Sequence, residues 1–430
     1  MNIQEEYKSK LKSAEEAVKL VESGESWFVG PATATPAYTM NALCDRYEEL
    51  EGVGFCGTNI GAPVPFLVDP KFKGHIEYCT YFTRPPLERP MANKGMIEYA
   101  SVCFTKTKYF LREVRNVTGM ITGASEMDEE GYMWFGPQGA SVNGMVSEMC
   151  NKIIIQVNKN MPKIPGDFPK IHISQVDAIV EMDYDIIVFP ESEITELEQT
   201  IANHILPYIR DNSTIQVGIG GLANAVSYGL DKRKNLVVYT EMLTPSMKHL
   251  DDVGALDPNQ QITVGFVLGK HDLNDWAANS GRVFIQQNYK TGQVAAIAAH
   301  DNFVSINGCL LVDLTGQVAS EGIGSKTLAG MGGSSAFVRG AALSDGGQSF
   351  ICLPSTVEID GKVTSNIVFG FPTATPVTVN RSDVMNIVTE YGVANIYTKS
   401  VRERAKALIS IAHPDFREEL TAQAKKAYFI

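Results

Sequence analysis

The segment Ser213-Thr-Ile-Gln-Val-Gly218-Ile-Gly220-Gly221-Leu-Ala-Asn-Ala-Val226 reads as a buried strand that passes through a glycine-rich turn into a helix. The β-branched run 214–217 predicts the strand, and the helix is expected to continue to Leu230. The glycines allow a tight turn and leave N–H groups at the helix start, which suits an anion or oxyanion. A second predicted strand, 235–243, carries Glu241 near its carboxyl end, where open α/β sheets bind ligands.

Three interpretations of this segment stay open on spacing alone. Gly218-x-Gly220-x-x-Ala223 fits a dinucleotide fingerprint, and Glu241 lies about 20 residues further on, where a ribose-binding acid belongs. Alternatively, Glu241 is a nucleophile and the glycine turn is its oxyanion hole. The third interpretation is a plain strand-to-helix turn with a solvated glutamate.

Length and composition narrow the class of protein. A chain of 430 residues predicts two domains. A net charge of −12 argues against nucleic acid as a partner. No apolar run has the length of a membrane span, and the first twenty residues lack the apolar core of a signal peptide. Seven cysteines without a C-x-x-C pair indicate a reducing cytoplasm and neither a disulfide framework nor a zinc site.

The order of predicted elements suggests a weak internal repeat. A helix over 4–22 leads to a strand at 27–29, a small-residue loop and a helix over 37–50. In the second half, a helix over 193–210 leads to the strand, loop and helix described above. Both strands end in Val-Gly. This pattern predicts two related α/β domains, 1–190 and 191–430, with the boundary at residues 189–192.

Short apolar runs predict further strands, and the carboxyl end of the chain predicts helices. The strands are expected to be covered on both faces, as in parallel sheets. The predicted strands are 152–157, 186–188, 263–268 and 310–312, and the predicted helices are 400–412 and 415–426.

A second glycine cluster lies at residues 321–337 and includes Gly330, Gly332 and Gly333. Small residues this closely spaced predict that the backbone approaches a ligand or another loop. The motifs of the common hydrolases, zinc proteases and nucleoside triphosphatases are absent: the chain has no G-x-S-x-G, H-E-x-x-H or P-loop.

The ordered set of motifs resembles the CoA-transferases of the acetyl-CoA hydrolase/transferase family, with 4-hydroxybutyrate CoA-transferase as the nearest type. The resemblance covers the second half of the chain and, more loosely, the first. Its motifs are Gly218-Ile-Gly220-Gly221-Leu-Ala-Asn-Ala-Val, Thr240-Glu241-Met242, Asp301-Asn-Phe-Val-Ser-Ile-Asn307, Asp313-Leu-Thr-Gly-Gln317, Gly332-Gly333, Phe337-Val-Arg339, Leu353-Pro-Ser-Thr356, Val388-Thr-Glu-Tyr-Gly-Val-Ala394 and Ile411-Ala-His-Pro-Asp-Phe-Arg417.

The resemblance implies a fold, a site and a reaction. The fold would be two related open α/β domains with mainly parallel sheets and an active site in the interdomain cleft. Glu241 matches the family's covalent residue, which would pass CoA between short-chain acids of the butyrate, 4-hydroxybutyrate or 5-aminovalerate type and acetate through a glutamyl-CoA thioester. The residues implied to bind CoA and the thioester are Gly218, Ile219, Gly220, Gly221, Leu222, Gly330, Gly332 and Gly333.

The resemblance further implies a cytoplasmic homodimer of fermentative metabolism that uses coenzyme A as a substrate and needs no metal or permanently bound cofactor. An acyl-CoA hydrolase is the nearest alternative, and an NAD-binding dehydrogenase is a remote one. The chain departs from the family pattern at Ala336, where many relatives have Asp, and at Glu358, where many have Lys. The acids themselves are therefore not predicted.

Overall fold

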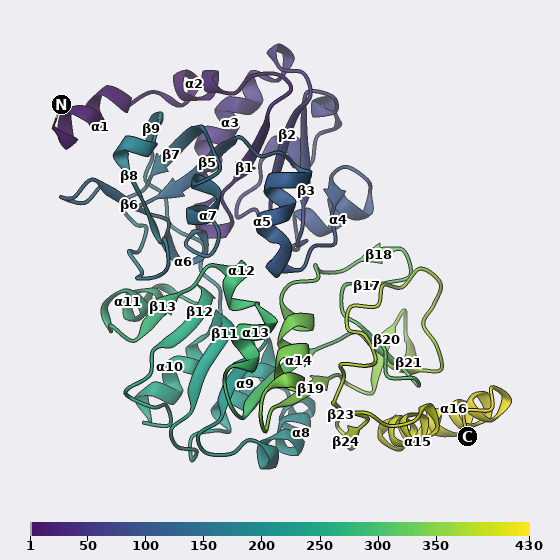
Figure 1. Ribbon diagram of the computed structural model, residues 1–430. Coiled ribbons are helices and arrows are strands. Elements are labelled where there is room, and N and C mark those ends of the chain that lie inside the picture. Colours follow the sequence, from purple (N-terminus) through teal and green to yellow (C-terminus); the bar gives the residue numbers. More distant parts are fainter. Residues whose placement is uncertain (1) are drawn as a thin grey trace. The chain divides into compact units, whose positions relative to one another are not determined.

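The computed structural model describes residues 2–430, which form two compact units (Figure 1). Unit 1 contains the chain up to Phe189 together with the segment Thr263–Lys290, and unit 2 contains Pro190–Ile262 and Thr291–Ile430. The predicted domains, 1–190 and 191–430, remain a prediction. The two units do not divide the chain at a single point, because one later segment belongs to unit 1.

Unit 1 is built on a parallel sheet with the strand order β4-β3-β2-β1-β5-β7-β9. Its central strands are almost fully buried, as their continuous apolar runs predict for strands covered on both faces. The strands are β1 (Ser26–Val29), β2 (Val53–Gly57), β3 (Ile76–Thr80), β4 (Glu98–Tyr99), β5 (Gly119–Ala124), β7 (Lys152–Val157) and β9 (Ala178–Glu181).

The predicted helix over residues 4–22 is wrong as one element. It is divided into α1 (Ile3–Lys10), α2 (Ala14–Ala17) and a 3₁₀ turn, Val18–Leu20. Leu11 leaves the helix and forms a bridge with Ile179 of β9, while the Lys12 N–H donates to the Ile179 carbonyl at 2.9 Å. Pairing with a strand that is distant in sequence therefore overrides the local helical pattern.

The predicted strand 186–188 is also wrong, because this part of the chain is irregular in the structure. Just before it, the side chain of Asn158 binds the backbone of Tyr184: its Nδ2 donates to the Tyr184 carbonyl at 3.0 Å, and its Oδ1 accepts from the Tyr184 N–H at 3.3 Å. A side chain thus takes the place of a strand partner. Ile186 lies in the core although it belongs to no strand, and this burial accounts for the apolar residue at that position.

Unit 1 also contains α3 (Ala37–Asp45), which is shorter than the predicted helix 37–50. A segment from the second half of the chain, Thr263–Lys290, belongs to unit 1 as well. That segment contains most of β12 (Ile262–Val267), α11 (His271–Asn279) and β13 (Val283–Ile285). It attaches to unit 1 through a bridge between Ile285 and Gly166, and the Ile285 N–H donates to the Pro165 carbonyl at 2.9 Å. The proline-rich loop 160–169 thus receives a strand from far along the chain.

Within unit 2 the strands follow the order β11-β10-β14-β19-β23-β24, and all neighbours are parallel except β23 and β24. The predicted strand 214–217 is confirmed with the same limits as β10. The bounds are β10 (Thr214–Val217), β11 (Val237–Leu243), β14 (Phe303–Gly308), β19 (Gln348–Cys352), β23 (Asn386–Thr389) and β24 (Gly392–Asn395).

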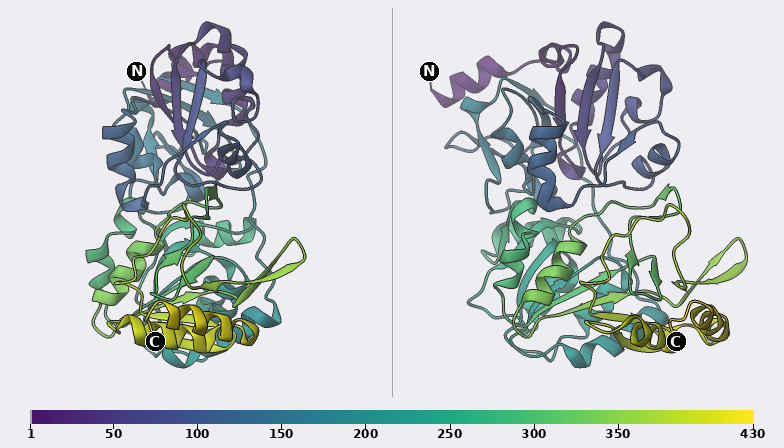
Figure 2. Two further views of the ribbon diagram at one scale, coloured as in Figure 1. Left: turned by 90° about the vertical axis from the view of Figure 1, so that its right-hand side faces the viewer. Right: turned by 45° about the vertical axis from the view of Figure 1, so that its right-hand side comes forward.

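Helices cover both faces of this sheet. On one face α8 (Glu196–Ile205) and α10 (Pro245–Asp252) pack against α9 (Gly221–Tyr228). On the other face α13 (Val294–Ala298) packs against α14 (Ser334–Leu343), which lies on β14 and β19. The chain ends in α15 (Val401–Ile411) and α16 (Pro414–Lys426), which lie side by side in both views of Figure 2. These last two helices match the predicted ones closely.

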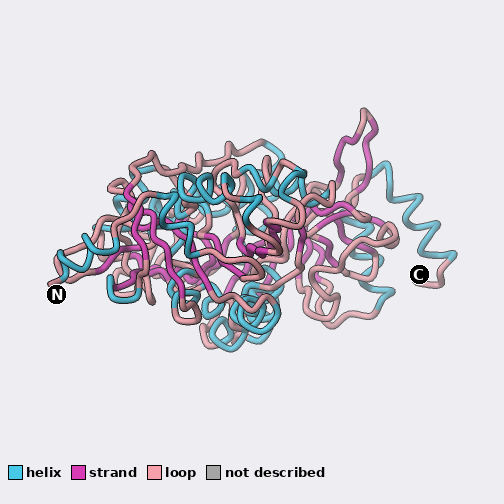
Figure 3. Tube along the Cα trace, turned by 90° about the horizontal axis from the view of Figure 1, so that it is seen from above, coloured by secondary structure: helices cyan, strands magenta, loops and turns pink. Residues whose placement is uncertain are grey.

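The small strands of unit 2 lie outside the main sheet. An antiparallel hairpin of β20 (Thr356–Ile359) and β21 (Lys362–Ser365) extends away from the rest of the unit and is the long projecting pair of strands in Figure 3. The predicted strand 310–312 corresponds to β15 (Leu311–Asp313), which pairs with β16 (Val318–Ala319) and β22 (Ile367–Val368).

The predicted relationship between the two halves is visible in the strand order. In unit 1 the order β2-β1-β5-β7-β9 matches β11-β10-β14-β19-β23 in unit 2. In each unit the strand that comes first along the chain, β1 or β10, is central and ends in Val-Gly. The fold is therefore α/β with two related, mainly parallel sheets, as predicted.

Candidate active site

Glu241 lies on β11 at the carboxyl edge of the unit 2 sheet. The parallel register pairs Thr214 with Val237 and Ile215 with Val238, so its continuation places Glu241 level with Gly218. The Thr240 hydroxyl confirms this register, because it donates to the Val217 carbonyl at 3.3 Å. β11 continues for two residues past Glu241, which is therefore fixed by a strand rather than carried on a loop.

One backbone donor binds the carboxylate of Glu241. The N–H of Gly333, the residue that precedes α14, donates to it. Burial raises the pKa of Glu241 to about 7, and the Gly333 hydrogen bond opposes that shift only in part. The positive end of the α14 dipole also favours the negative charge here. The residue as a whole is only half-buried, so Glu241 keeps part of its surface exposed.

The approach of Gly333 to Glu241 requires glycine. A Cβ at position 333 would lie 2.5 Å from Oε2 of Glu241 and 3.2 Å from Cε2 of Phe337. Phe337 is buried and stacks on Phe303 with ring centroids 6.2 Å apart, and Phe303 in turn contacts Tyr239, two residues before Glu241. These three rings form a buried aromatic layer that joins α14, β14 and β11.

The glycine turn after β10 has three different local environments. The N–H of Gly218 donates to the Ile306 carbonyl at 2.9 Å, so it is not free for a ligand as the sequence suggested. Gly220 has φ +105°, a conformation that only glycine adopts readily, and a Cβ at this position would meet no atom within 4 Å. Gly221 begins α9, and a Cβ there would collide with the Glu193 carbonyl and the Glu198 carboxylate.

The structure brings part of the predicted set together directly. Gly333 contacts Glu241, and Gly330 and Gly332 are buried in the same loop before α14. The 218–222 turn follows the neighbouring strand at the level of Glu241. Within that turn Leu222 is half-buried, whereas Ile219 is 60% exposed.

A buried polar network beside the turn was not predicted from the sequence. Ser305 Oγ donates to Gln216 Oε1 at 2.7 Å, and Asn307 Nδ2 donates to the same oxygen at 3.1 Å and to Ser305 Oγ at 2.8 Å. All three side chains are buried and fix β10 to β14 immediately before Gly218. The available signal was the alternation of polar residues within two otherwise apolar strands.

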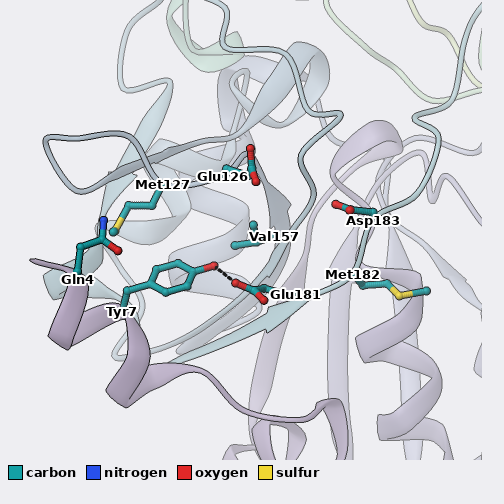
Figure 4. A pocket seen from close by; sticks show the side chains of 8 residues that line it. All are labelled: Gln4, Tyr7, Glu126, Met127, Val157, Glu181, Met182 and Asp183. Carbon is teal, nitrogen blue, oxygen red and sulfur yellow. Dashed lines mark hydrogen bonds between the residues drawn. The ribbon is translucent and has the colours of Figure 1, made fainter.

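A pocket of about 440 Å³ lies elsewhere, in unit 1, and contains none of the predicted residues (Figure 4). Tyr7 on α1 donates a hydrogen bond to Glu181 across it at 2.8 Å. Glu126 and Asp183 also line it, and Lys159 pairs with Asp183 at 2.5 Å. A lining rich in carboxylates repels anions, so this pocket does not suit an anionic ligand.

Two features of residues 2–430 narrow the class of site. The described side chains include no group of three or more His, Cys, Asp and Glu arranged to hold a metal ion. In the same part of the chain, no helix combines the length and apolar character needed to cross a membrane. The arrangement at Glu241 provides a desolvated carboxylate beside a helix start, which suits nucleophilic attack on an activated carbonyl.

The chain matches two family models, the acetyl-CoA hydrolase/transferase N-terminal domain over residues 1–191 and the C-terminal domain over residues 269–424. It is 34% identical to the butyryl-CoA:acetate CoA-transferase of Anaerostipes caccae, with 99% of this chain and 98% of that protein covered. It is also 34% identical to the 4-hydroxybutyrate coenzyme A transferase of Clostridium kluyveri, with both chains covered completely.

Among solved structures, RipA from Yersinia pestis superposes with a TM-score of 0.91 at 31% identity, and the whole of both chains is covered. The acetyl-CoA hydrolase of Saccharomyces cerevisiae is more distant, at 25% identity over 98% of this chain and 89% of that protein. The chain therefore belongs to the acetyl-CoA hydrolase/transferase family.

Proposed function

We propose that this protein transfers coenzyme A between short-chain carboxylic acids, with Glu241 as the covalent nucleophile. The observation that carries the proposal is the desolvated Glu241 carboxylate, held by the Gly333 N–H at the sheet edge. The substrates named for the relatives, butyryl-CoA, acetate and 4-hydroxybutyrate, support the class of acid. Butyrate, 4-hydroxybutyrate or 5-aminovalerate type acids are the proposed partners of acetate.

In the first step, one Glu241 oxygen attacks the thioester carbonyl of an acyl-CoA. The carbon–sulfur bond breaks, so the products are an acyl-glutamyl anhydride and the CoA thiolate. The thiolate then attacks the glutamyl carbonyl, and the anhydride bond breaks to release the first acid as its carboxylate. Glu241 now carries CoA as a glutamyl thioester. A second carboxylate reverses both steps and leaves as the new acyl-CoA.

Within this reaction, Gly333 has a positioning role. Its N–H binds one carboxylate oxygen and leaves the other free to attack, which limits the rotational freedom of the nucleophile. We assign the loop of Gly330, Gly332 and Gly333 to the thioester and the turn Gly218–Leu222 to CoA. The open space at Gly220 and the exposed Ile219 side chain support contact with a ligand there.

The proposed enzyme works in the cytoplasm as a homodimer, with CoA as a substrate and no permanently bound cofactor or metal. The family resemblance supports the homodimer, and seven cysteines without a C-x-x-C pair support a reducing cytoplasm. The chemistry is consistent with it, because the carboxylate and thiolate supply both nucleophiles and the acids supply both leaving groups.

Acetate dependence separates a transferase from a hydrolase. With butyryl-CoA as donor, we expect acetyl-CoA to form only when acetate is present, with parallel double-reciprocal plots for the two substrates. Glu241→Gln should lower kcat/KM by about 10³-fold or more, because it removes the nucleophile. Glu418→Gln, at an exposed position on α16, is the matched control. Free CoA released at the same rate with and without acetate would instead identify a hydrolase.

A further inference from the structure

A second pocket in unit 1, of about 230 Å³, is lined by two neighbouring cysteines. Cys56 on β2 and Cys79 on β3 are direct partners in the parallel register, so their side chains leave the same face of the sheet. Adjacent strands lie about 4.8 Å apart, and this spacing falls within the Cα–Cα range that a disulfide spans. The register therefore places two thiols where they can be joined.

The pocket gives a small molecule access to this face of the sheet. Gly54, two residues before Cys56, also lines it, and a Cβ at Gly54 would meet no atom within 4 Å. Cys56 and Cys79 are themselves almost completely covered, so the pocket is their route to solvent. A volume of about 230 Å³ exceeds the roughly 30 Å³ of one liquid water several times, and a hydroperoxide therefore fits.

The charges that face the two thiols make them unequal. Arg115, after the π-helical turn Phe110–Val114, lines the pocket and pairs with Glu98 at 2.6 Å. The pKa of Cys79 is lowered by a hydrogen bond with Cys56 and by the Arg115 charge, against burial and Glu98. Burial and the same hydrogen bond raise the pKa of Cys56. The direction of the two pKa shifts thus favours Cys79 over Cys56 as the thiolate.

Two further carboxylates line the pocket without reversing this arrangement. Glu25 is paired with Lys152 at 2.6 Å, which offsets its charge. Glu77 points from β3 on the same face as Cys79, by strand alternation, and is exposed to solvent that screens it. Arg115 remains the cation of the lining.

The other buried cysteines provide an internal comparison. Burial raises the pKa of Cys44 to about 11 and that of Cys150 to about 12, and it also raises the pKa of Cys352. These groups stay protonated at neutral pH and are poor nucleophiles. Reactivity toward an oxidant should therefore be low at these three cysteines.

We propose that Cys79 and Cys56 form an oxidation site, at which a hydroperoxide converts the two thiols to a disulfide. The Cys79 thiolate attacks the peroxide, a sulfur–oxygen bond forms, the oxygen–oxygen bond breaks and hydroxide, protonated to water, leaves. The Cys56 thiol then attacks the resulting sulfenic acid, and a second water leaves as the sulfur–sulfur bond forms. The two sulfurs lose two electrons in total, and the peroxide gains them.

The test is peptide mapping of the full chain after treatment with hydrogen peroxide and without reductant. Trypsin separates the two cysteines, because Lys71 and Lys73 lie between them. We expect a linked pair of peptides containing Cys56 and Cys79, which disappears on reduction and persists in the control Cys44→Ser. The proposal would be overturned if no linked pair formed and if Cys44 and Cys352 were oxidised at the same rate as Cys56 and Cys79.

Two variants test the roles of the individual groups. In Cys56→Ser the sulfenic acid at Cys79 has no partner, so dimedone should label Cys79 selectively. Arg115→Gln keeps both thiols and changes a partly exposed position. We expect its oxidation rate to fall about threefold for each unit of pKa regained, since the tenfold loss of thiolate is partly offset by greater nucleophilicity. An unchanged rate and equal dimedone labelling of all cysteines would contradict the assigned roles.

Discussion

At the scale of single residues, burial and one backbone donor act in opposite directions on Glu241. Burial makes the charged form costly, and the Gly333 hydrogen bond recovers part of that cost. A carboxylate left in water would be a poor nucleophile, whereas a desolvated one is more reactive when it is ionised. Burial therefore lowers the fraction of Glu241 that is ionised and makes the ionised carboxylate a better nucleophile.

The pH profile of the reaction follows from this pKa. Because the pKa of Glu241 is raised to about 7 and the carboxylate is the proposed nucleophile, kcat/KM should fall as the pH drops below about 7. The decline should approach tenfold per pH unit, measured from pH 5 to 9 with a fixed acyl-CoA. A profile that stays flat down to pH 5 would show that the free enzyme reacts with an ordinary, solvated carboxylate.

Gly333→Ala tests the contact between the α14 start and the nucleophile. The added Cβ would lie 2.5 Å from Glu241 Oε2, so either the carboxylate or the loop must move. We expect kcat/KM to fall about 10²-fold, the loss typical of a displaced catalytic group. Gly370→Ala is the control, because a Cβ there meets no atom within 4 Å. Full activity in Gly333→Ala would mean that the approach of Gly333 is dispensable.

At the scale of elements, Glu88 connects helix to strand in unit 1. It begins α4 (Glu88–Asn93) and accepts hydrogen bonds from the Tyr78 hydroxyl at 2.8 Å and the Thr80 hydroxyl at 3.0 Å, both on β3. The Arg84 N–H donates to its other oxygen at 3.2 Å. Glu88 is completely buried, and burial raises its pKa to about 7 despite these donors.

This raised pKa predicts how stability depends on pH. Unfolded Glu88 ionises near its ordinary pKa, whereas folded Glu88 holds its proton up to about pH 7, so stability falls as the pH rises between these values. The loss should be of order 3 kcal/mol above pH 7. Urea unfolding at pH 5 and pH 8 measures it. Glu88→Gln, which does not titrate, should reduce the difference between the two pH values; an equal difference would refute the assignment.

The sequence predicts elements well where local pattern and tertiary structure agree. The runs 152–157 and 214–217 are continuous and β-branched, and both form strands with those limits. The helix 4–22 fails because Leu11 pairs with Ile179, and the strand 186–188 fails because Asn158 binds the preceding backbone. Contacts this distant in sequence leave no local signal.

The candidate site shows the same division. Glu241 and Gly333 are marked by family motifs, although only the structure shows that one binds the other. The network of Gln216, Ser305 and Asn307 joins residues about 90 positions apart. It depends on the pairing of β10 with β14, which a local pattern of apolar and polar residues does not specify.

At the scale of the whole molecule, two sheets of the same strand order carry different residues at equivalent places. In unit 1 the pairing of Phe28 with Cys56 places Thr58 level with Gly30, the glycine that follows β1. In unit 2 the corresponding place, level with Gly218, is occupied by Glu241. The threonine is buried and bonds to the Phe82 carbonyl at 3.3 Å. The carboxylate that we propose for covalent chemistry therefore occurs in one of the two related units.

The most direct test of Glu241 as the covalent nucleophile is peptide mass spectrometry after the enzyme is mixed with butyryl-CoA or acetyl-CoA. Glu241 should carry CoA as a thioester, so its peptide should gain the mass of CoA minus water. The adduct should vanish on addition of acetate, and Glu241→Gln should not form it. An unmodified Glu241 peptide, under conditions in which the acyl-CoA is turned over, would contradict the covalent mechanism proposed for this protein.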